Sequence, residues 1–161
     1  MKIFSYILMI FTIASSAYAN DNAITLKHFS VTIPEGMVID EQSDDKVAFI
    51  FSGDEDLENG TLSVSSKESD HLLNFSSSWL KIRAATLSGK KVLYEEEKTF
   101  GGLTWKVIAV TGTTGQCEIK NVLYYSIGNN IQYMLHYHCN LENFDALKRA
   151  IDAIIVSFKT E

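Results

Sequence analysis

Hydrophobic and polar residues alternate in short stretches of the first half of the chain, as they do in half-buried strands. Residues 29–33 read Phe-Ser-Val-Thr-Ile, and the turn residues Pro34-Glu-Gly36 follow, so we expect a strand that ends there. Val47–Phe51 and Thr61–Ser65 have the composition of two further strands. The first half of the chain therefore predicts part of a β-sheet.

The spacing of the hydrophobic residues changes after residue 69. Four of them recur at intervals of three and four residues, which places them on one side of a helix: Leu72, Phe75, Trp79 and Ile82. Ser69 or Asp70 can cap the start of this helix, and Ser88-Gly89 follows its end. We predict a mid-chain helix over residues 70–87.

Strand patterns return in the second half of the chain and are separated by glycine-containing turns. Such consecutive strands form an antiparallel meander. The four predicted strands are Val92–Thr99, Trp105–Thr111, Glu118–Ser126 and Ile131–Cys139.

The end of the chain carries the pattern of an amphipathic helix that runs from Leu141 to Phe158, with Asn140 or Asn143 as its cap. The order of strands, helix, four strands and helix predicts an α+β domain, in which about six to seven antiparallel strands are covered by the mid-chain and C-terminal helices. We find no repeat, linker or change of composition along residues 20–161, so these residues are expected to form a single domain.

The N-terminus has the pattern of an export signal. Lys2 is followed by a short apolar run and then by Ala17-Tyr-Ala19, which fits the small-residue site of signal peptidase. The run is too short to span a bilayer stably. We therefore expect residues 1–19 to be a cleaved signal peptide and the protein to be periplasmic or secreted.

The charge of the chain argues against two classes of partner. After removal of residues 1–19, 13 basic and 20 acidic side chains leave a net charge of −7. Nucleic acids and anionic lipids bind clustered basic surfaces, so neither is an expected partner. No further segment has the length and apolar character of a membrane span.

The pattern of the whole predicted domain resembles the Mog1/PsbP-like domain group, which includes the bacterial periplasmic DcrB-like proteins. The resemblance lies in the opening Phe29-x-Val-x-Ile-Pro-Glu-Gly-Met37, the helix after the first strands, the Gly101-Gly102 hairpin, the long meander and the last helix ending in Ser157-Phe158. It implies an α/β/α sandwich with a binding or assembly role. It supplies no motif of site residues.

The two cysteines lie at the outer ends of the last two predicted strands. If the hairpin folds about Gly128, which is midway between them, then Cys117 lies opposite Cys139 on an apolar face. Two cysteines in an exported chain usually form a structural bridge. We therefore predict a disulfide between them, and we expect neither cysteine to be a nucleophile because the sequence has no C-x-x-C pair.

His136 and His138 lie on the same face of one predicted strand, and the same hairpin register places Glu118 opposite His138. Two imidazoles and a carboxylate are ligands that zinc accepts, so these three residues are a candidate metal site. The same register places Lys120 opposite His136, where its charge would repel a cation. The alternative is a polar sheet face, where glutamate–histidine pairs make stability depend on pH.

A second candidate cation site is the acidic loop between the second and third predicted strands. Asp54, Asp56 and Glu58 are spaced as oxygen ligands of calcium are, but Gly60 and Ser65 do not fit the EF-hand positions for the turn glycine and the bidentate acid. The alternative is a solvated turn.

The sequence contains no recognisable catalytic motif, so an enzyme is not expected. The leading hypothesis is a non-catalytic accessory protein of the bacterial envelope that binds another protein, such as an immunity protein or a chaperone-like factor. The competing hypotheses are a metal carrier or metal-dependent enzyme built on His136, His138 and Glu118, and a small-molecule binder with a cavity between helix and sheet. Aromatic residues that could reach a partner, although most are expected in the core, are Trp105, Tyr124, Tyr133 and Tyr137.

Overall fold

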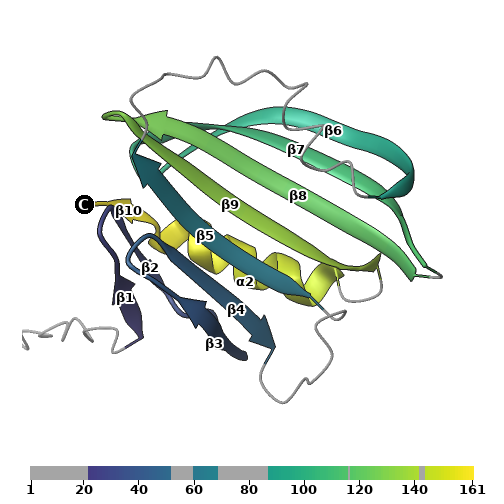
Figure 1. Ribbon diagram of the computed structural model, residues 1–161, viewed down its shortest axis with the longest axis horizontal. Helices are drawn as coiled ribbons and strands as arrows, with labels where there is room; N and C mark the ends of the chain where they lie inside the picture. Colours follow the sequence, from purple (N-terminus) through teal and green to yellow (C-terminus); the bar gives the residue numbers. More distant parts are fainter. Residues whose placement is uncertain (1–21, 52–59, 69–86, 116, 142–143) are drawn as a thin grey trace, which may run out of the picture.

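The computed structural model describes residues 22–51, 60–68, 87–115, 117–141 and 144–161. Within this part of the chain, one long antiparallel sheet, one small sheet and one helix make up the fold (Figure 1). The long sheet has seven strands in the order β3-β4-β5-β9-β8-β7-β6, and the small sheet has the order β1-β2-β10. The elements are β1 (Ala23–Thr25), β2 (Phe29–Thr32), β3 (Met37–Gln42), β4 (Lys46–Phe51), β5 (Thr61–Glu68), β6 (Ser88–Phe100), β7 (Leu103–Thr114), β8 (Cys117–Gly128), β9 (Ile131–Asn140), α2 (Phe144–Ser157) and β10 (Lys159–Thr160).

The predicted strands and the C-terminal helix are confirmed, and most of the strands extend beyond their predicted ends. Three short strands were not predicted, namely β1, β3 and β10. Three other predictions lie outside the described residues: the signal peptide over residues 1–19, the mid-chain helix over residues 70–87 except its last residue, and the calcium ligands Asp54, Asp56 and Glu58. The α+β class with a seven-stranded antiparallel sheet is therefore established.

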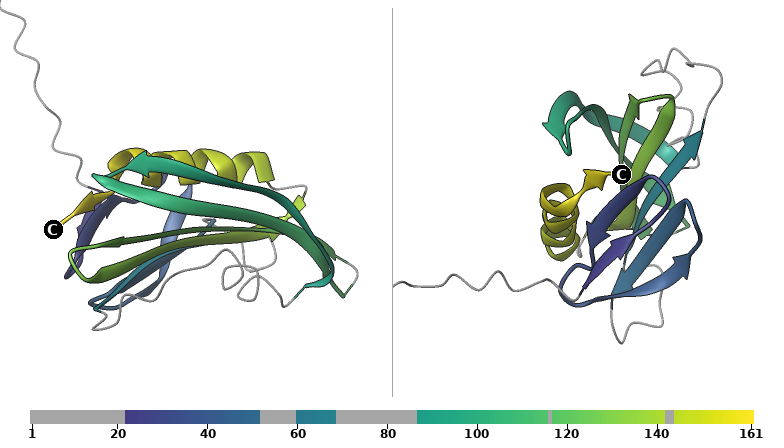
Figure 2. Two further views of the ribbon diagram at one scale, coloured as in Figure 1. Left: turned by 90° about the horizontal axis from the view of Figure 1, so that it is seen from above. Right: turned by 90° about the vertical axis from the view of Figure 1, so that its left-hand side faces the viewer.

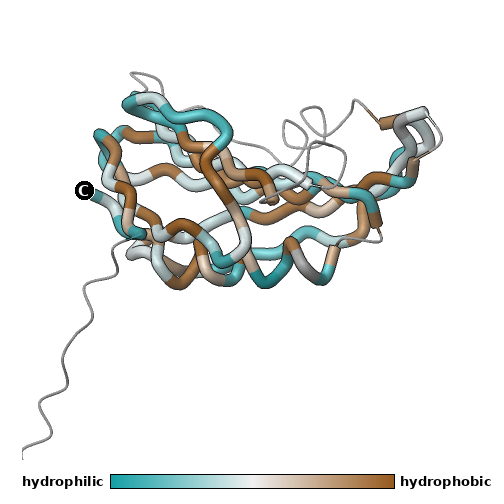
Figure 3. The backbone as a smooth tube through the Cα atoms, turned by 90° about the horizontal axis from the view of Figure 1, so that it is seen from below, coloured by the Kyte–Doolittle hydropathy of each residue, from teal (hydrophilic) through white to brown (hydrophobic). Residues whose placement is uncertain are grey.

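The long sheet is curved, and α2 lies along its concave side (Figure 2). Hydrophobic and hydrophilic residues alternate along α2 (Figure 3), because apolar side chains recur every three or four residues on the side that meets the sheet. Each such side chain stabilises the fold by roughly 1.5–3 kcal/mol when fully buried. The buried residues of α2 are Leu147, Ala150, Ile151 and Ile154, and Phe158, which directly follows the helix, is buried as well.

An aromatic cluster fills the space where the end of α2 meets the concave face of the sheet. Phe158 is 2% exposed, and its ring lies 5.1 Å from the ring of Trp105 and 5.7 Å from that of Tyr133. Phe29 of the small sheet and Phe100 of β6 also pack against Phe158. One side chain therefore joins the helix end, the long sheet and the small sheet.

The convex face of the long sheet carries a second, smaller hydrophobic cluster. Its buried members come from the residue before β6, from β7 and from β8, and they are Leu87, Ile108, Val110, Ile119, Leu123 and Tyr125. The central strand β8 is therefore buried on both faces along Asn121–Ser126. Among the described residues, no helix is long and apolar enough to span a membrane.

The turn between β8 and β9 decides which residues share a face. The loop consists of Asn129 and Asn130, which both have positive φ values (51° and 62°), and Gly128 pairs with Ile131. This is the backbone of a two-residue hairpin turn. The prediction that the β8–β9 hairpin turns about Gly128 was therefore wrong. Relative to that prediction, every residue of β8 pairs with a residue of β9 three positions further along the chain.

Candidate functional site

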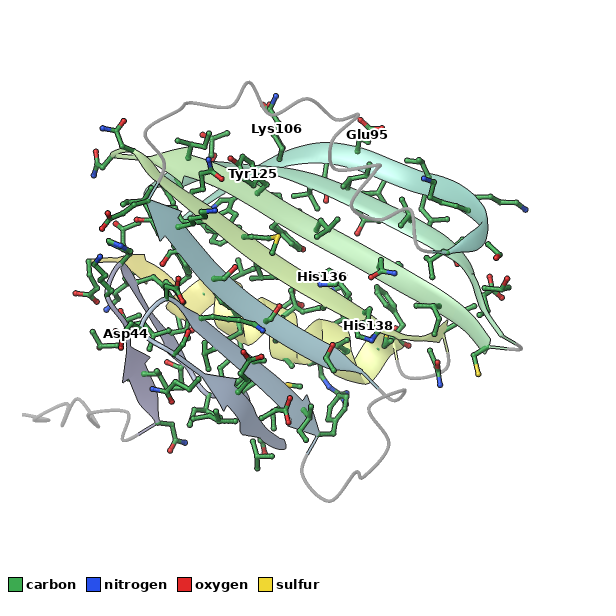
Figure 4. All side chains as sticks on the ribbon, viewed as in Figure 1. Asp44, Glu95, Lys106, Tyr125, His136 and His138 are labelled. Atoms are coloured by element: carbon green, nitrogen blue, oxygen red, sulfur yellow. The ribbon has the colours of Figure 1, made fainter. Side chains whose placement is uncertain are left out.

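The two histidines of β9 lie on the convex face of the sheet, turned away from α2 (Figure 4). The rings of His136 and His138 are stacked, with centroids 5.9 Å apart. The residues opposite them in β8 are Leu123 and Asn121. The two imidazoles therefore lie beside the hydrophobic cluster of that face.

Both histidines make hydrogen bonds to side chains of the neighbouring strands. His136 Nε2 is 2.8 Å from Asn121 Oδ1 of β8, and because a carbonyl oxygen only accepts, this ring nitrogen donates. His138 Nδ1 is 2.8 Å from Thr61 Oγ1 of β5. Burial lowers the pKa of His138 below its usual value of 6.5. Each imidazole is therefore tied by a hydrogen bond to a neighbouring strand on the convex face of the sheet.

The structure contradicts the predicted metal site. Glu118 shares the parity of Lys120 and Val122, which lie on the concave face, whereas the histidines lie on the convex face. Its Oε1 atom accepts a hydrogen bond from Thr111 Oγ1, at a distance of 3.4 Å. The described residues contain no group of three side chains that could hold a metal ion. The error follows from the register, because a displacement of three positions moves one partner to the other face.

The predicted disulfide fails for the same reason. Cys139 lies opposite Lys120 and is fully buried in the concave core. Cys117 packs against the hydrophobic cluster of the convex face. No bridge joins the two residues. Burial raises the pKa of the Cys139 thiol to about 11, so this thiol is a poor nucleophile at neutral pH.

The aromatic residues that were candidates for partner contact belong to the core. All four are less than 4% exposed, as was expected of most of them: Trp105, Tyr124, Tyr133 and Tyr137. Burial raises the pKa of Tyr124 and of Tyr137. They belong to the core cluster that also contains Leu147, Ile151 and Ile154 of α2. These rings therefore stabilise the fold.

Exposed apolar side chains instead occur on the two terminal strands of the long sheet. Val38 and Ile39 of β3 are 42% and 39% exposed, and β6 exposes Val92, Leu93 and Tyr94. Sequence reasoning missed β3, although Met37-Val38-Ile39 is an apolar run directly after a turn. A terminal strand has a neighbour on one side only, which is why apolar residues in it stay accessible.

The surroundings of Val38 and Ile39 are acidic. Exposed carboxylates follow them in β3, which bulges between Ile39 and Glu41, and in the turn from β3 to β4. Lys46 forms an ion pair with Glu41 and neutralises part of this charge. We call the surface formed by Val38, Ile39, Asp40, Glu41, Asp44 and Asp45 the β3 surface. It combines two exposed apolar side chains and a net negative charge with a strand edge that has no further strand beside it in the described part of the chain.

The position of His138 predicts a pH dependence of stability. Because its pKa is lowered in the folded state, the unfolded chain binds a proton more readily, so the contribution of this residue to the free energy of unfolding falls as the pH drops below about 6.5. Chemical denaturation between pH 8 and pH 5 should show this loss, and His138→Gln should show a smaller one. An equal loss in both proteins would contradict the assignment.

The fold defined by these elements is Mog1/PsbP-like: an antiparallel sheet with a C-terminal helix packed across it. Three solved structures have a fold similar to that of this chain. LpqN from Mycobacterium tuberculosis, described as involved in cell envelope biogenesis, aligns with a TM-score of 0.63 and 11% identity over 82% of each chain. CyanoP, the PsbP of Synechocystis sp. PCC 6803, aligns with a TM-score of 0.57 and 13% identity over 83% of this chain and 86% of its own.

A mutant of Mog1 aligns with a TM-score of 0.51 and 10% identity over 84% of this chain and 95% of its own. No family model matches the sequence, and no curated protein matches it. At such low identity, the similarity concerns the fold.

Proposed function

We propose that this protein is an exported, non-catalytic accessory protein of the bacterial envelope that acts by binding another protein. The N-terminal pattern of Lys2, an apolar run and Ala17-Tyr-Ala19 supports export. The similarity of fold to LpqN, a protein of cell envelope biogenesis, supports an accessory role in the envelope. Roles as an immunity protein or as a chaperone-like factor are two forms of this proposal, since both act through a binding surface.

The observation that carries the proposal is the β3 surface. Among the residues that the structure describes, β4 is the only strand that pairs with β3. The other edge of such a terminal strand offers backbone donors and acceptors to a further strand, and proteins use such edges to bind extended segments. Val38 and Ile39 are accessible beside this edge. A partner segment with apolar side chains near these two residues would bury them.

The charge of the β3 surface indicates the chemistry of the partner. Asp40, Asp44 and Asp45 are exposed at the bulge and turn of this strand. Basic side chains in the bound segment would complement them, and the attraction would weaken as salt increases. We therefore expect an extended segment that combines apolar and basic residues.

Site-specific photo-crosslinking in the native host tests this proposal. A photoreactive phenylalanine analogue at Val38 should form an adduct with one protein of defined mass. The same analogue at Val156, which is 86% exposed on α2, is the matched control and should not form that adduct. The same adducts from both positions, or none from Val38, would contradict a partner at the β3 surface.

A further inference from the structure

A cavity of about 460 Å³ lies at the end of β3, between the turn that joins β1 to β2 and the turn that joins β3 to β4. Both sheets contribute to its lining, which consists of Thr25, Leu26, Lys27, Gln42, Ser43 and Asp44. The backbone nitrogen of Lys27 donates a hydrogen bond of 2.9 Å to the carbonyl oxygen of Asp44. The two turns are therefore joined beside the cavity, and Figure 4 shows Asp44 next to the small sheet.

The cavity and Ile39 lie on the same face of β3. Gln42 pairs with Val47 and Ile39 pairs with Phe49, and both of these partners belong to the core of the concave face. The two β3 residues share this face although they are three positions apart, because the bulge between Ile39 and Glu41 adds one residue. A segment that runs along β3 and covers Ile39 therefore reaches the cavity at the end of the same strand.

The cavity offers oxygen acceptors to a cationic group. Asp44 is exposed, and the described part of the chain supplies no ion pair to its carboxylate. The side-chain amide of Gln42 likewise has no hydrogen-bond partner among the described residues. Lys27 also lines the cavity, but its ammonium group is bound by the carboxylate of Glu68 at 2.6 Å. A carboxylate and an amide oxygen are therefore available at one end of the β3 edge.

We propose that this cavity binds a basic side chain of the extended segment that pairs with β3. The inference rests on the proposed function, because it assigns one position of the same partner. A lysine or arginine side chain in the cavity donates hydrogen bonds to the carboxylate of Asp44 and to the side-chain oxygen of Gln42. Proteins that bind strands at a sheet edge obtain affinity from backbone hydrogen bonds and specificity from pockets that receive single side chains.

The next residue, Asp45, provides a matched comparison for Asp44. Asp45 is exposed in the same turn, but it does not line this cavity, and its carboxylate accepts a hydrogen bond of 2.8 Å from Ser43 Oγ. Asp44→Asn and Asp45→Asn each remove one negative charge from the turn and keep the size of the side chain. Only Asp44→Asn removes a charge from the cavity, so the two variants separate the cavity from the general charge of the β3 surface.

Selection from a random library of short linear peptides, displayed on phage and bound to the purified protein, tests this assignment. The wild type should enrich peptides that carry a lysine or arginine at a fixed spacing from apolar residues. Asp45→Asn should enrich the same peptides, whereas Asp44→Asn should enrich the apolar residues without the basic one. An enriched synthetic peptide should bind Asp44→Asn about tenfold more weakly than it binds the wild type.

Ile39→Lys separates failure of this inference from failure of the proposed function. It should abolish binding of the enriched peptides, because lysine on an edge strand opposes pairing. If it does so while Asp44→Asn and Asp45→Asn weaken binding equally, the cavity assignment is overturned and the β3 surface stands. If Ile39→Lys binds the peptides as tightly as the wild type, or if the wild type enriches no peptide, both are overturned. Circular dichroism checks that each variant is folded.

Discussion

Phe158→Ala is expected to lower the free energy of unfolding by about 3–5 kcal/mol, as truncations of buried aromatic residues do. Phe158 is 2% exposed, and its ring contacts the rings of Phe29, Trp105 and Tyr133. Alanine would leave a cavity where the helix end, the long sheet and the small sheet meet. Urea unfolding followed by far-ultraviolet circular dichroism measures the change.

Val156→Ala is the matched control for this prediction. Val156 lies in the last turn of α2, two residues before Phe158, but is 86% exposed. Its replacement should change the free energy of unfolding by less than about 0.5 kcal/mol. Similar losses in the two variants would show that the aromatic cluster does not hold the three parts together.

Gly101→Ala is expected to cost about 2–4 kcal/mol of stability, from backbone strain together with a steric clash. Gly101 lies in the turn between β6 and β7 and has a φ of 57°. A Cβ at this position would lie 2.5 Å from a ring carbon of Phe158 and 2.9 Å from its carbonyl oxygen. Since one of these atoms is backbone, the turn or the end of α2 must move.

The next residue separates the two causes. Gly102 also has a positive φ, of 75°, but a Cβ there would meet no atom within 4 Å. Gly102→Ala should therefore cost only the backbone strain, about 1–2 kcal/mol. Thermal unfolding of both variants gives the comparison. Equal melting temperatures would contradict the close approach of Phe158 to Gly101.

The positions of the elements were predictable because periodicity reports them directly. The alternation in residues 131–139 and the three- and four-residue spacing after Leu141 both reflect which side of an element is buried. The short strand β3 was missed for a related reason. It is a terminal strand in which only Met37 is buried, so it has little alternation to detect.

The register of the β8–β9 hairpin was not predictable from the same signals. Gly128 and Asn129-Asn130 are both plausible turn residues, and the structure uses the two asparagines. Since side chains alternate between faces, the displacement by an odd number of positions separated Cys117 from Cys139 and Glu118 from the two histidines. The choice of turn therefore decided both candidate sites.

Recovery of the native complex tests the proposed protein-binding role most directly. The protein would be purified from the envelope fraction of its host as the wild type, as Ile39→Lys and as Val156→Lys, and co-purifying proteins quantified by mass spectrometry. We predict one partner in near-equal amount with the wild type and with Val156→Lys, and at least about tenfold less with Ile39→Lys, because lysine on an edge strand opposes pairing. The same proteins in the same amounts from all three would contradict binding at the β3 surface.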